Sequence, residues 1–436
     1  MTTGPAPQPG PDPGSGKGAE SSPASPRALR LRPLLILETS TLLSGIANGI
    51  TLIAFPWLVL QLTGSASAAG LIGAITAAPL VLSFLFSGVV VDIVGRRRVA
   101  VVSDVLSMTS AALVPIFDAS VGLSFWLLAA LAVMGSIFDP AGVSAREAVL
   151  PEVAAASGMD RERVNGIHEA VWGAAYLIGP GIGGLCLGWF GAAPTYWLTA
   201  GMFAVSSMVI FTLRVPGSGR PAEHERPEGV FRGAWEGVRF VFGDRALRAV
   251  ALISMVIVGA WLPVEGVILP VHFDALDQPQ QLGITIMATA LGGLLGAVAY
   301  SAWGARWRPH LTFALAVLLA GIGVMGMALM PPFPIFLVAA FLAGLAYGPV
   351  GPVVNLAMQN RSPFRLRGRV VSLMTSMAYV AGPLGYVLIG PGVQAWGVTA
   401  VFMAVGVVIA VMGALALPMR SLRAIDDGPL YEAAAE

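Results

Sequence analysis

Residues 68–98 read AAGLIGAITAAPLVLSFLFSGVVVDIVGRRR, an apolar run that ends in three consecutive arginines. The apolar part, residues 68–91, exceeds the ~20 residues that an α-helix needs to cross the hydrocarbon core of a bilayer. Because Lys and Arg are retained on the cytoplasmic side of a membrane, the arginines predict that this helix ends in the cytoplasm. The segment therefore predicts one membrane-spanning helix with a defined direction.

The same pattern recurs along the whole chain and predicts an all-α membrane protein. Of the 436 residues, 56% are hydrophobic and only 11% are charged, whereas a soluble domain carries roughly 25% charged residues because its surface meets water. Most of the exterior must therefore face lipid. We predict twelve transmembrane helices in two six-helix bundles, over residues 34–60, 68–91, 99–117, 123–145, 164–189, 193–213, 248–271, 281–303, 310–330, 334–356, 369–390 and 398–419.

The distribution of positive residues predicts the orientation. The 25 Lys and Arg residues fall in the N-terminal segment, in every second predicted loop or in the C-terminal tail. The alternate loops, such as residues 118–123 and 191–194, contain none. We therefore predict a multi-pass protein of the cell membrane with both termini in the cytoplasm.

The chain divides into five predicted segments. They are a disordered cytoplasmic leader (1–33), a six-helix bundle (34–213), a cytoplasmic linker (214–247), a second six-helix bundle (248–419) and a cytoplasmic tail (420–436). Apolar residues at helical spacing over 230–242 predict an amphipathic helix on the membrane surface within the linker. The run GPGIGG at 179–184 and the run GPLG at 382–385 occupy matching positions in the two bundles. Two similar halves around a site at the membrane midplane are typical of secondary transporters.

Several classes of function are disfavoured by what the sequence lacks. Cys186 is the only cysteine, which excludes an intramolecular disulfide and a cysteine metal cluster. The sequence has no P-loop, so ATP is not expected to drive it, and no basic patch interleaved with aromatic residues that would bind nucleic acid. We expect a monomeric secondary active transporter without a cofactor, driven by the proton gradient across the lipid bilayer.

The loop after the second predicted helix carries residues suited to gating. Gly88 permits close approach of helices and Gly95 permits a tight turn. Asp92 at the membrane edge can pair with Arg96 or Arg97, or cap a neighbouring helix. The pattern resembles the loop signature of the major facilitator superfamily. We expect a cytoplasmic clasp that breaks when the halves move; the alternative is an anchor that only sets topology.

The fifth predicted helix contains closely spaced glycines that permit tight helix packing, and a proline that bends it. The residues that form this predicted pivot are Gly179, Pro180, Gly183 and Gly184. The run resembles the antiporter signature of exporters in the same superfamily, with Ala175 where a glycine is usual. The alternative is a packing seam with no influence on the direction of transport.

Further stretches make the resemblance specific to one family within this superfamily. They are FPWLVL at 55–60, GRRRV at 95–99, LPE at 150–152, GRVV at 368–371 and AGPLG at 381–385. From about Leu34 to Pro418 the chain resembles, in the same order, the Tap-type actinobacterial multidrug exporters. The resemblance implies proton-driven efflux of drugs of the tetracycline, aminoglycoside or spectinomycin type. Asn48 stands where an acid is usual in the first helix of that family. The resemblance therefore does not imply that the first helix of this chain carries a proton.

Acidic residues inside the predicted helices are the candidate functional groups. A charge that faces lipid costs several kcal/mol, so each acid should face the bundle interior or an aqueous cavity. For Asp139, an ion pair with Arg146 two turns away is an alternative to a role in transport. For Glu38 and Asp104, which lie close to the predicted cytoplasmic ends, contact with water or with an arginine is the alternative. The candidates are Glu38, Asp104, Asp139, Glu169 and Glu265.

Two of these acids share a helix face with aromatic residues. Glu169 shares its face with Trp172 and Tyr176, and Glu265 follows Trp261 by one turn. An acid beside an aromatic wall suits a cationic amphiphilic substrate, through charge attraction and cation–π contact. The same acid could exchange a proton for the substrate, or be a structural group held by hydrogen bonds.

Uncharged polar residues complete the predicted cavity: Asn48 on the first helix, and Tyr347 and Asn355 on the tenth. Each could instead serve an interhelical hydrogen bond. The leading hypothesis is a proton-coupled exporter of small drug-like molecules. The alternatives are an importer or a siderophore or metabolite exporter on the same scaffold. An intramembrane lipid-modifying enzyme is less favoured because the acids are dispersed over five helices, and a channel because no ring of filter residues is visible.

The topology can be tested by fusing reporter enzymes after residue 436 and within residues 214–248. We expect cytoplasmic reporters to be active at both positions and an exported reporter to be inactive, because arginines flank both. Activity of the exported reporter at either position would contradict the predicted orientation.

Overall fold

The computed structural model describes residues 31–215, 238–363, 366–427 and 430. Side chains at 80–89, 92, 305, 367–369 and 372 lie outside this description. Within the described ranges the chain is helical, and no strand is present. The predicted amphipathic helix at 230–242 lies mostly outside these ranges, and its last part, residues 238–242, is helical.

The first half of the chain forms the helices α1 (Arg32–Thr63), α2 (Ala66–Val94), α3 (Arg96–Ser120), α4 (Phe125–Ser136), α5 (Asp139–Ala148), α6 (Leu150–Ser157), α7 (Arg161–Phe190) and α8 (Ala192–Phe211). The second half forms α10 (Arg245–Pro263), the π-helical turn η2 (Val264–Ile268), α11 (Leu269–Asp274), α12 (Pro279–Trp303), the 3₁₀ turn η3 (Gly304–Arg306), α13 (Pro309–Ala328), α14 (Phe333–Tyr347), α15 (Val350–Arg361), α16 (Arg367–Trp396), α17 (Val398–Ala416) and α18 (Arg420–Arg423).

The number and type of spans agree with the prediction. Eleven helical stretches of the described chain are long and apolar enough to cross a membrane, and the described apolar part of α2, Ala66–Pro79, adds a shorter one. Together they confirm an all-α membrane protein.

Three predicted spans are interrupted rather than continuous. The fourth breaks before Asp139-Pro140, where α4 gives way to α5. The seventh contains the π-helical turn, and the tenth breaks after Tyr347. Proline lies at or next to each interruption, because it lacks the N–H that continues a helix.

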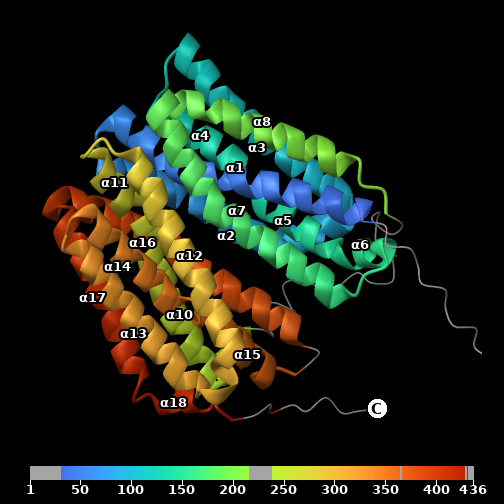
Figure 1. The fold of residues 1–436 in the computed structure, drawn as a ribbon, viewed down its shortest axis with the longest axis vertical. Helices are drawn as coiled ribbons and strands as arrows, with labels where there is room; N and C mark the ends of the chain where they lie inside the picture. The colour runs from blue at the N-terminus through green and yellow to red at the C-terminus, as the bar shows by residue number, and fades with distance from the viewer. Residues whose placement is uncertain (1–30, 216–237, 364–365, 428–429, 431–436) are drawn as a thin grey trace, which may run out of the picture.

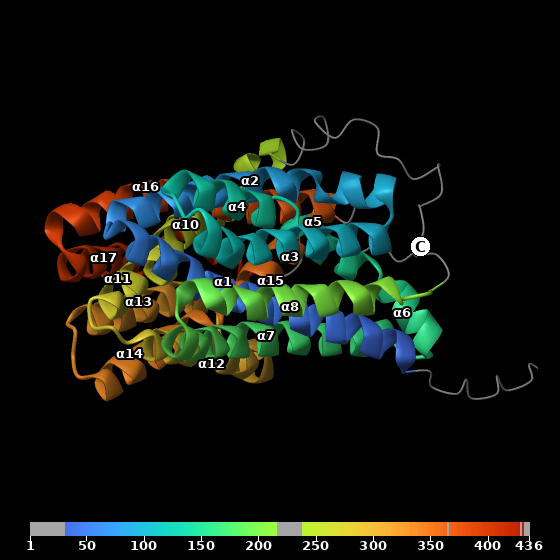
Figure 2. The same ribbon diagram turned by 90° about the horizontal axis from the view of Figure 1, so that it is seen from above.

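The two halves meet at one end of the molecule and diverge toward the other. In Figure 1 the blue-to-green half and the yellow-to-red half come together at the left and separate toward α6 and α18; Figure 2 gives the same ribbon from above. At the end where they meet, α2 packs on α16 and α7 packs on α12. We call this the closed end, and the end that carries Arg32 and α18 the open end.

Glycines let the halves approach closely at the closed end. A Cβ atom at Gly184 would lie 3.1 Å from the Cα of Gly283, and one at Gly70 would lie 2.8 Å from the Cα of Gly390. The side-chain oxygen of Gln394 on α16 also accepts hydrogen bonds across the halves, from the N–H of Ala66 (3.1 Å) and from Ser65 Oγ (3.4 Å). The closed end is therefore joined by small-residue packing and by one side chain that caps the start of α2.

Other glycines of the same runs pack within one half. A Cβ at Gly179 would lie 2.9 Å from the Cα of Gly49 on α1. Gly385 contacts the carbonyl oxygen of Gly259 on α10 in the same way. The run at 179–184 thus lies between α1 of its own half and α12 of the other. On α16, Gly385 packs within its half, and Gly390, further along the helix, packs on Gly70 of the other half.

Ion pairs at the open end hold the second half together. The Asp244 carboxylate caps α10 by accepting from the N–H groups of Ala246 (2.8 Å) and Leu247 (2.9 Å), and Arg361 donates to it at 2.8 Å. Burial alone would raise the pKa of Asp244, but the hydrogen bonds from Arg361 and the Leu247 N–H outweigh it, so the pKa lies below its usual value.

The two kinds of glycine contact predict different outcomes for the same substitution. Gly179→Val should destabilise the first half by about 1–3 kcal/mol, because the added side chain overpacks the contact with α1. Gly184→Val should instead push the halves apart at the closed end. We expect a lower thermal unfolding midpoint for the first variant, and for the second a longer spin-label distance across the closed end with a smaller loss of stability. Equal effects of both variants on both measurements would contradict this division.

Candidate functional site

A buried carboxylate lies where the seventh span is irregular. Glu265 sits in η2, between Pro263 and Pro270, and is 7% exposed. Since neither proline has an N–H, the backbone bonds that would continue a regular α-helix on either side are lost. A π-helical turn that accommodates this loss is common at functional sites. The local sequence thus explains why the helix presents Glu265 to the interior.

Aromatic residues from both halves surround this carboxylate. Tyr176 Oη on α7 donates to one oxygen at 2.9 Å, and Trp261 Nε1 donates to the other at 3.0 Å. The Trp261 ring stacks on Tyr347 with centroids 5.4 Å apart and an interplanar angle of 10°. We name these four residues the Glu265 cluster. The predicted pairing of Trp261 with Glu265 is present, and Tyr176 and Tyr347 join it from other helices.

The fifth-helix acid lies apart from this cluster. Glu169 is on α7 but is exposed toward the open end, two turns from Tyr176. Trp172 lies between them, and its indole N–H is buried without a hydrogen-bond partner in the described chain. Asn355 on α15 is exposed as well. The break after Tyr347 places Tyr347 and Asn355 on separate helices. Roles for Glu169, Trp172 and Asn355 in transport stay predictions.

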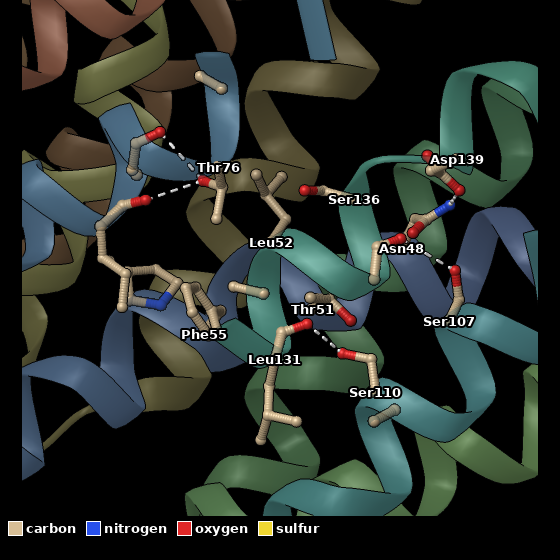
Figure 3. A pocket seen from close by; sticks show the side chains of 18 of the residues that line it. Asn48, Thr51, Leu52, Phe55, Thr76, Ser107, Ser110, Leu131, Ser136 and Asp139 are labelled. Atoms are coloured by element: carbon tan, nitrogen blue, oxygen red, sulfur yellow. Dashed lines mark hydrogen bonds between the residues drawn. The ribbon is translucent and has the colours of Figure 1, made fainter. Parts of the chain in front are cut away.

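A second acid lines a cavity whose walls come mainly from the first half. Asp139 begins α5, and one of its carboxylate oxygens accepts from Asn48 Nδ2 at 3.0 Å. Both residues face a cavity of about 380 Å³, shown in Figure 3. We name it the Asp139 chamber. Its walls come from α1, α2, α3, α4, α5 and α8, with Leu262, Gly266, Tyr379 and Tyr386 contributed by the second half.

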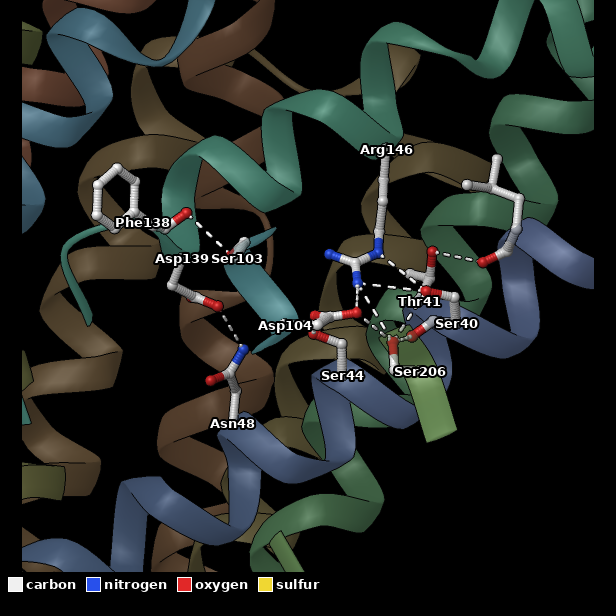
Figure 4. A network of polar contacts seen from close by, with 11 residues as sticks. Ser40, Thr41, Ser44, Asn48, Ser103, Asp104, Phe138, Asp139, Arg146 and Ser206 are labelled. Carbon is white, nitrogen blue, oxygen red and sulfur yellow. Dashed lines mark hydrogen bonds and ion pairs between the residues drawn. The ribbon is translucent and has the colours of Figure 1, made fainter. Parts of the chain in front are cut away.

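Arg146 forms its ion pair with Asp104, so the pair with Asp139 that was left open as an alternative is absent from the described residues. Its guanidinium donates to Asp104 at 2.6 Å, and both side chains are at most 3% exposed. Asp139 and Arg146 share a face of α5, but seven residues place them about 10 Å apart along the axis. Ser44 and Ser206 donate to the same Asp104 carboxylate at 3.2 and 2.7 Å, as Figure 4 shows. This network joins α1, α3, α5 and α8.

A second buried pair was missed by sequence reasoning. His168 Nδ1 lies 3.1 Å from Glu38 Oε1, and both side chains are buried. No sequence pattern relates these residues, because they come from α1 and α7 and meet only through the packing of those helices.

The gating residues are described in part. Gly95 has a φ of 99°, a backbone conformation that favours glycine, and it joins α2 to α3 as the tight turn predicted. The Arg96 side chain pairs with Glu152 of α6, within the same half, rather than reaching across the halves. Arg97 donates to the carbonyl of Leu213 at 3.1 Å. The Asp92 side chain and the surroundings of Gly88 lie outside the description, so the predicted clasp stays a prediction.

The buried Asp104–Arg146 pair should dominate the stability of the first half. Arg146→Gln leaves a buried carboxylate without its cation, which costs about 3–5 kcal/mol. Arg96→Gln removes a pair whose arginine is 22% exposed, and such a pair contributes about 0–1 kcal/mol. We expect a much lower unfolding midpoint for Arg146→Gln, and partial recovery in the Asp104→Asn/Arg146→Gln double variant. Equal midpoints for Arg146→Gln and Arg96→Gln would contradict the assignment.

Comparisons with known proteins agree with this architecture. The pattern of the Major Facilitator Superfamily matches residues 37–385 and 265–430. The chain is 41% identical over 397 residues to the multidrug efflux pump Tap of Mycolicibacterium fortuitum, covering 90% of this chain and 97% of that protein. It is 40% identical over 400 residues to the multidrug efflux pump Tap of Mycobacterium tuberculosis, covering 91% and 96%.

Solved structures are similar in fold. The nucleoside transporter NupG superposes with a TM-score of 0.73 at 13% identity, over 88% of this chain and 98% of that one. The D-xylose-proton symporter gives a TM-score of 0.69 at 13% identity, over 89% and 97%. The two structures support the fold, and the sequence comparisons support the family: this chain belongs to the major facilitator superfamily of membrane transporters.

Proposed function

We propose that this chain exports cationic amphiphilic drugs in exchange for protons. The observation that carries the proposal is the buried Glu265 carboxylate, held between aromatic donors that come from both halves. The similarity to the Tap multidrug efflux pumps supports drugs as the substrate class. Compounds of the tetracycline, aminoglycoside or spectinomycin type are the first candidates.

The Glu265 cluster has the chemistry to bind a cation. A buried charge is costly unless it is paired, so the carboxylate favours either a proton or a cationic group of the substrate. The stacked rings of Trp261 and Tyr347 offer an aromatic face beside the acid, which suits an ammonium group by cation–π attraction. A proton and a cationic drug therefore compete for one group, which is the basis of exchange.

The position of the cluster links this competition to movement of the halves. Tyr176 belongs to the first half and Glu265 to the second, so their hydrogen bond spans the interface. Displacement of the Tyr176 hydroxyl by a drug, or protonation of the carboxyl, changes that bond. Under the predicted topology the open end faces the cytoplasm, so the described conformation is the one that takes up substrate for export.

Glu265→Gln tests the role of the carboxylate. Glutamine keeps the shape and hydrogen-bonding capacity but cannot ionise. We expect about a ten- to hundredfold loss of affinity for a cationic drug, since a hydrogen bond to a charged group contributes about 1.5–3 kcal/mol. A neutral drug should bind nearly as well as to the unchanged chain. Binding is measured on purified protein, and efflux in proteoliposomes with an imposed proton gradient.

Glu169→Gln tests the other predicted acid, which is exposed and lies outside the Glu265 cluster. We expect less than about a fivefold change in affinity, as for other solvent-exposed charge contacts. Wild-type, gradient-driven efflux of the cationic drug by Glu265→Gln would show that Glu265 is structural, and would defeat the proposed exchange at this site.

A further inference from the structure

The Asp139 chamber borders the Glu265 cluster but contains none of its members. No member of that cluster lines the chamber, although Leu262 and Gly266 on either side of Glu265 do. Its volume of about 380 Å³ falls within the range of drug-sized sites, about 300–1,000 Å³. The chamber is therefore large enough to hold a ligand of its own, between walls that come mainly from the first half and partly from the second.

The serine and threonine hydroxyl groups that line the chamber already donate hydrogen bonds to backbone carbonyl groups. Thr51 donates to the carbonyl of Ala47 at 3.0 Å, Ser107 to that of Gly135 at 3.2 Å, and Ser110 to that of Leu131 at 2.6 Å. Thr76 and Ser136 donate to carbonyls of their own helices in the same way. Each of these oxygens can therefore only accept from a ligand.

Tyr196 on α8 is the exception among these hydroxyls. The residue is 3% exposed, and its hydroxyl oxygen is buried without a hydrogen-bond partner in the described chain. It lines the chamber together with Asn48 and Asp139. A buried hydroxyl without a partner is costly, so Tyr196 keeps an uncommitted donor in a residue of the chamber wall. Tyr196 supplies the donor that the serines and threonines lack.

Charge and shape then define the class of ligand. Asp139 accepts only from Asn48 among the hydrogen bonds described, and its second oxygen is available for a cation. The remaining walls are largely apolar, with Leu52, Phe55 and Phe203 among them. A ligand that complements this surface has an apolar body. It carries one protonated amine that pairs with Asp139 and one oxygen that accepts from the Tyr196 hydroxyl.

We propose that the Asp139 chamber is a second binding site for amphiphilic amines, which is occupied independently of the Glu265 cluster. The proposal deepens the proposed function and rests on it for the substrate class, but the site itself rests on the chamber. Two sites give the chain two stoichiometric binding events per molecule. Ligand affinity at one site should be little affected by removal of the acid at the other.

The test uses quinacrine, a fluorescent amphiphilic amine with a methoxy oxygen, and the purified full-length chain in lipid nanodiscs. We expect two molecules bound per chain. Asp139→Asn should weaken one of them about ten- to hundredfold, and Tyr196→Phe should weaken the same one about two- to tenfold, the range for one hydrogen bond. Asp118→Asn, at an exposed acid on α3, is the matched control and should leave both unchanged.

A filled chamber provides a variant that keeps the acid. Ala132→Phe, at a residue that lines the chamber, should remove the same binding event while Glu265→Gln removes the other. One molecule bound per chain, with Asp139→Asn and Ala132→Phe both without effect, would overturn the second site. Failure of the proposed function gives a different result, because Glu265→Gln would then retain both binding events and normal efflux.

Discussion

Lipid supplies neither a counter-charge nor a hydrogen-bond partner, and this constraint shapes the interior of the protein. The buried acids of the described spans each meet a polar group from a different helix. Glu38 meets His168, Asp104 meets Arg146, and Glu265 meets Tyr176. These contacts tie helices that are distant in sequence, so the same requirement that keeps charges away from lipid also determines which helices are joined through polar contacts. The one such bond that crosses between halves involves the acid that we place in transport.

The fold was largely predictable because membrane insertion is governed by features that are local in sequence. Apolar runs and arginine positions need no knowledge of tertiary contacts, and they predicted the type and number of spans. The glycine runs also indicated close packing correctly, since a missing side chain permits the same approach wherever a partner helix lies. Gly179 against Gly49 and Gly184 against Gly283 show one run serving two partners. Which glycine faces which helix could not be predicted, because that depends on the rotation of helices in the assembled bundle.

The candidate site was predictable only within single helices. The Trp261–Glu265 contact follows from one-turn spacing, and the structure contains it. The alternative partner considered for Arg146, Asp139, came from spacing along α5 without the neighbouring helix α3, which brings Asp104 to the guanidinium. Tyr196 and His168 acquire their surroundings from other helices, so no pattern in their own segments identified them. Tyr176 was identified on its own helix face, but with Glu169 rather than with its actual partner Glu265. The breaks before Asp139 and around Glu265 carried a signal in their prolines, and this signal marks both acids that face candidate binding sites.

The cap that Gln394 places on the start of α2 has a consequence for turnover. A transporter must visit two shapes in every cycle, so neither can be much lower in free energy than the other. A neutral side-chain hydrogen bond contributes only about 0.5–1.5 kcal/mol, because water replaces it when it breaks. When two helices that touch through glycines separate, no large side chain loses its packing contacts. The closed end is thus held together by weak interactions, and the two conformations can have similar free energies. The binding of a small substrate is then enough to favour one conformation over the other.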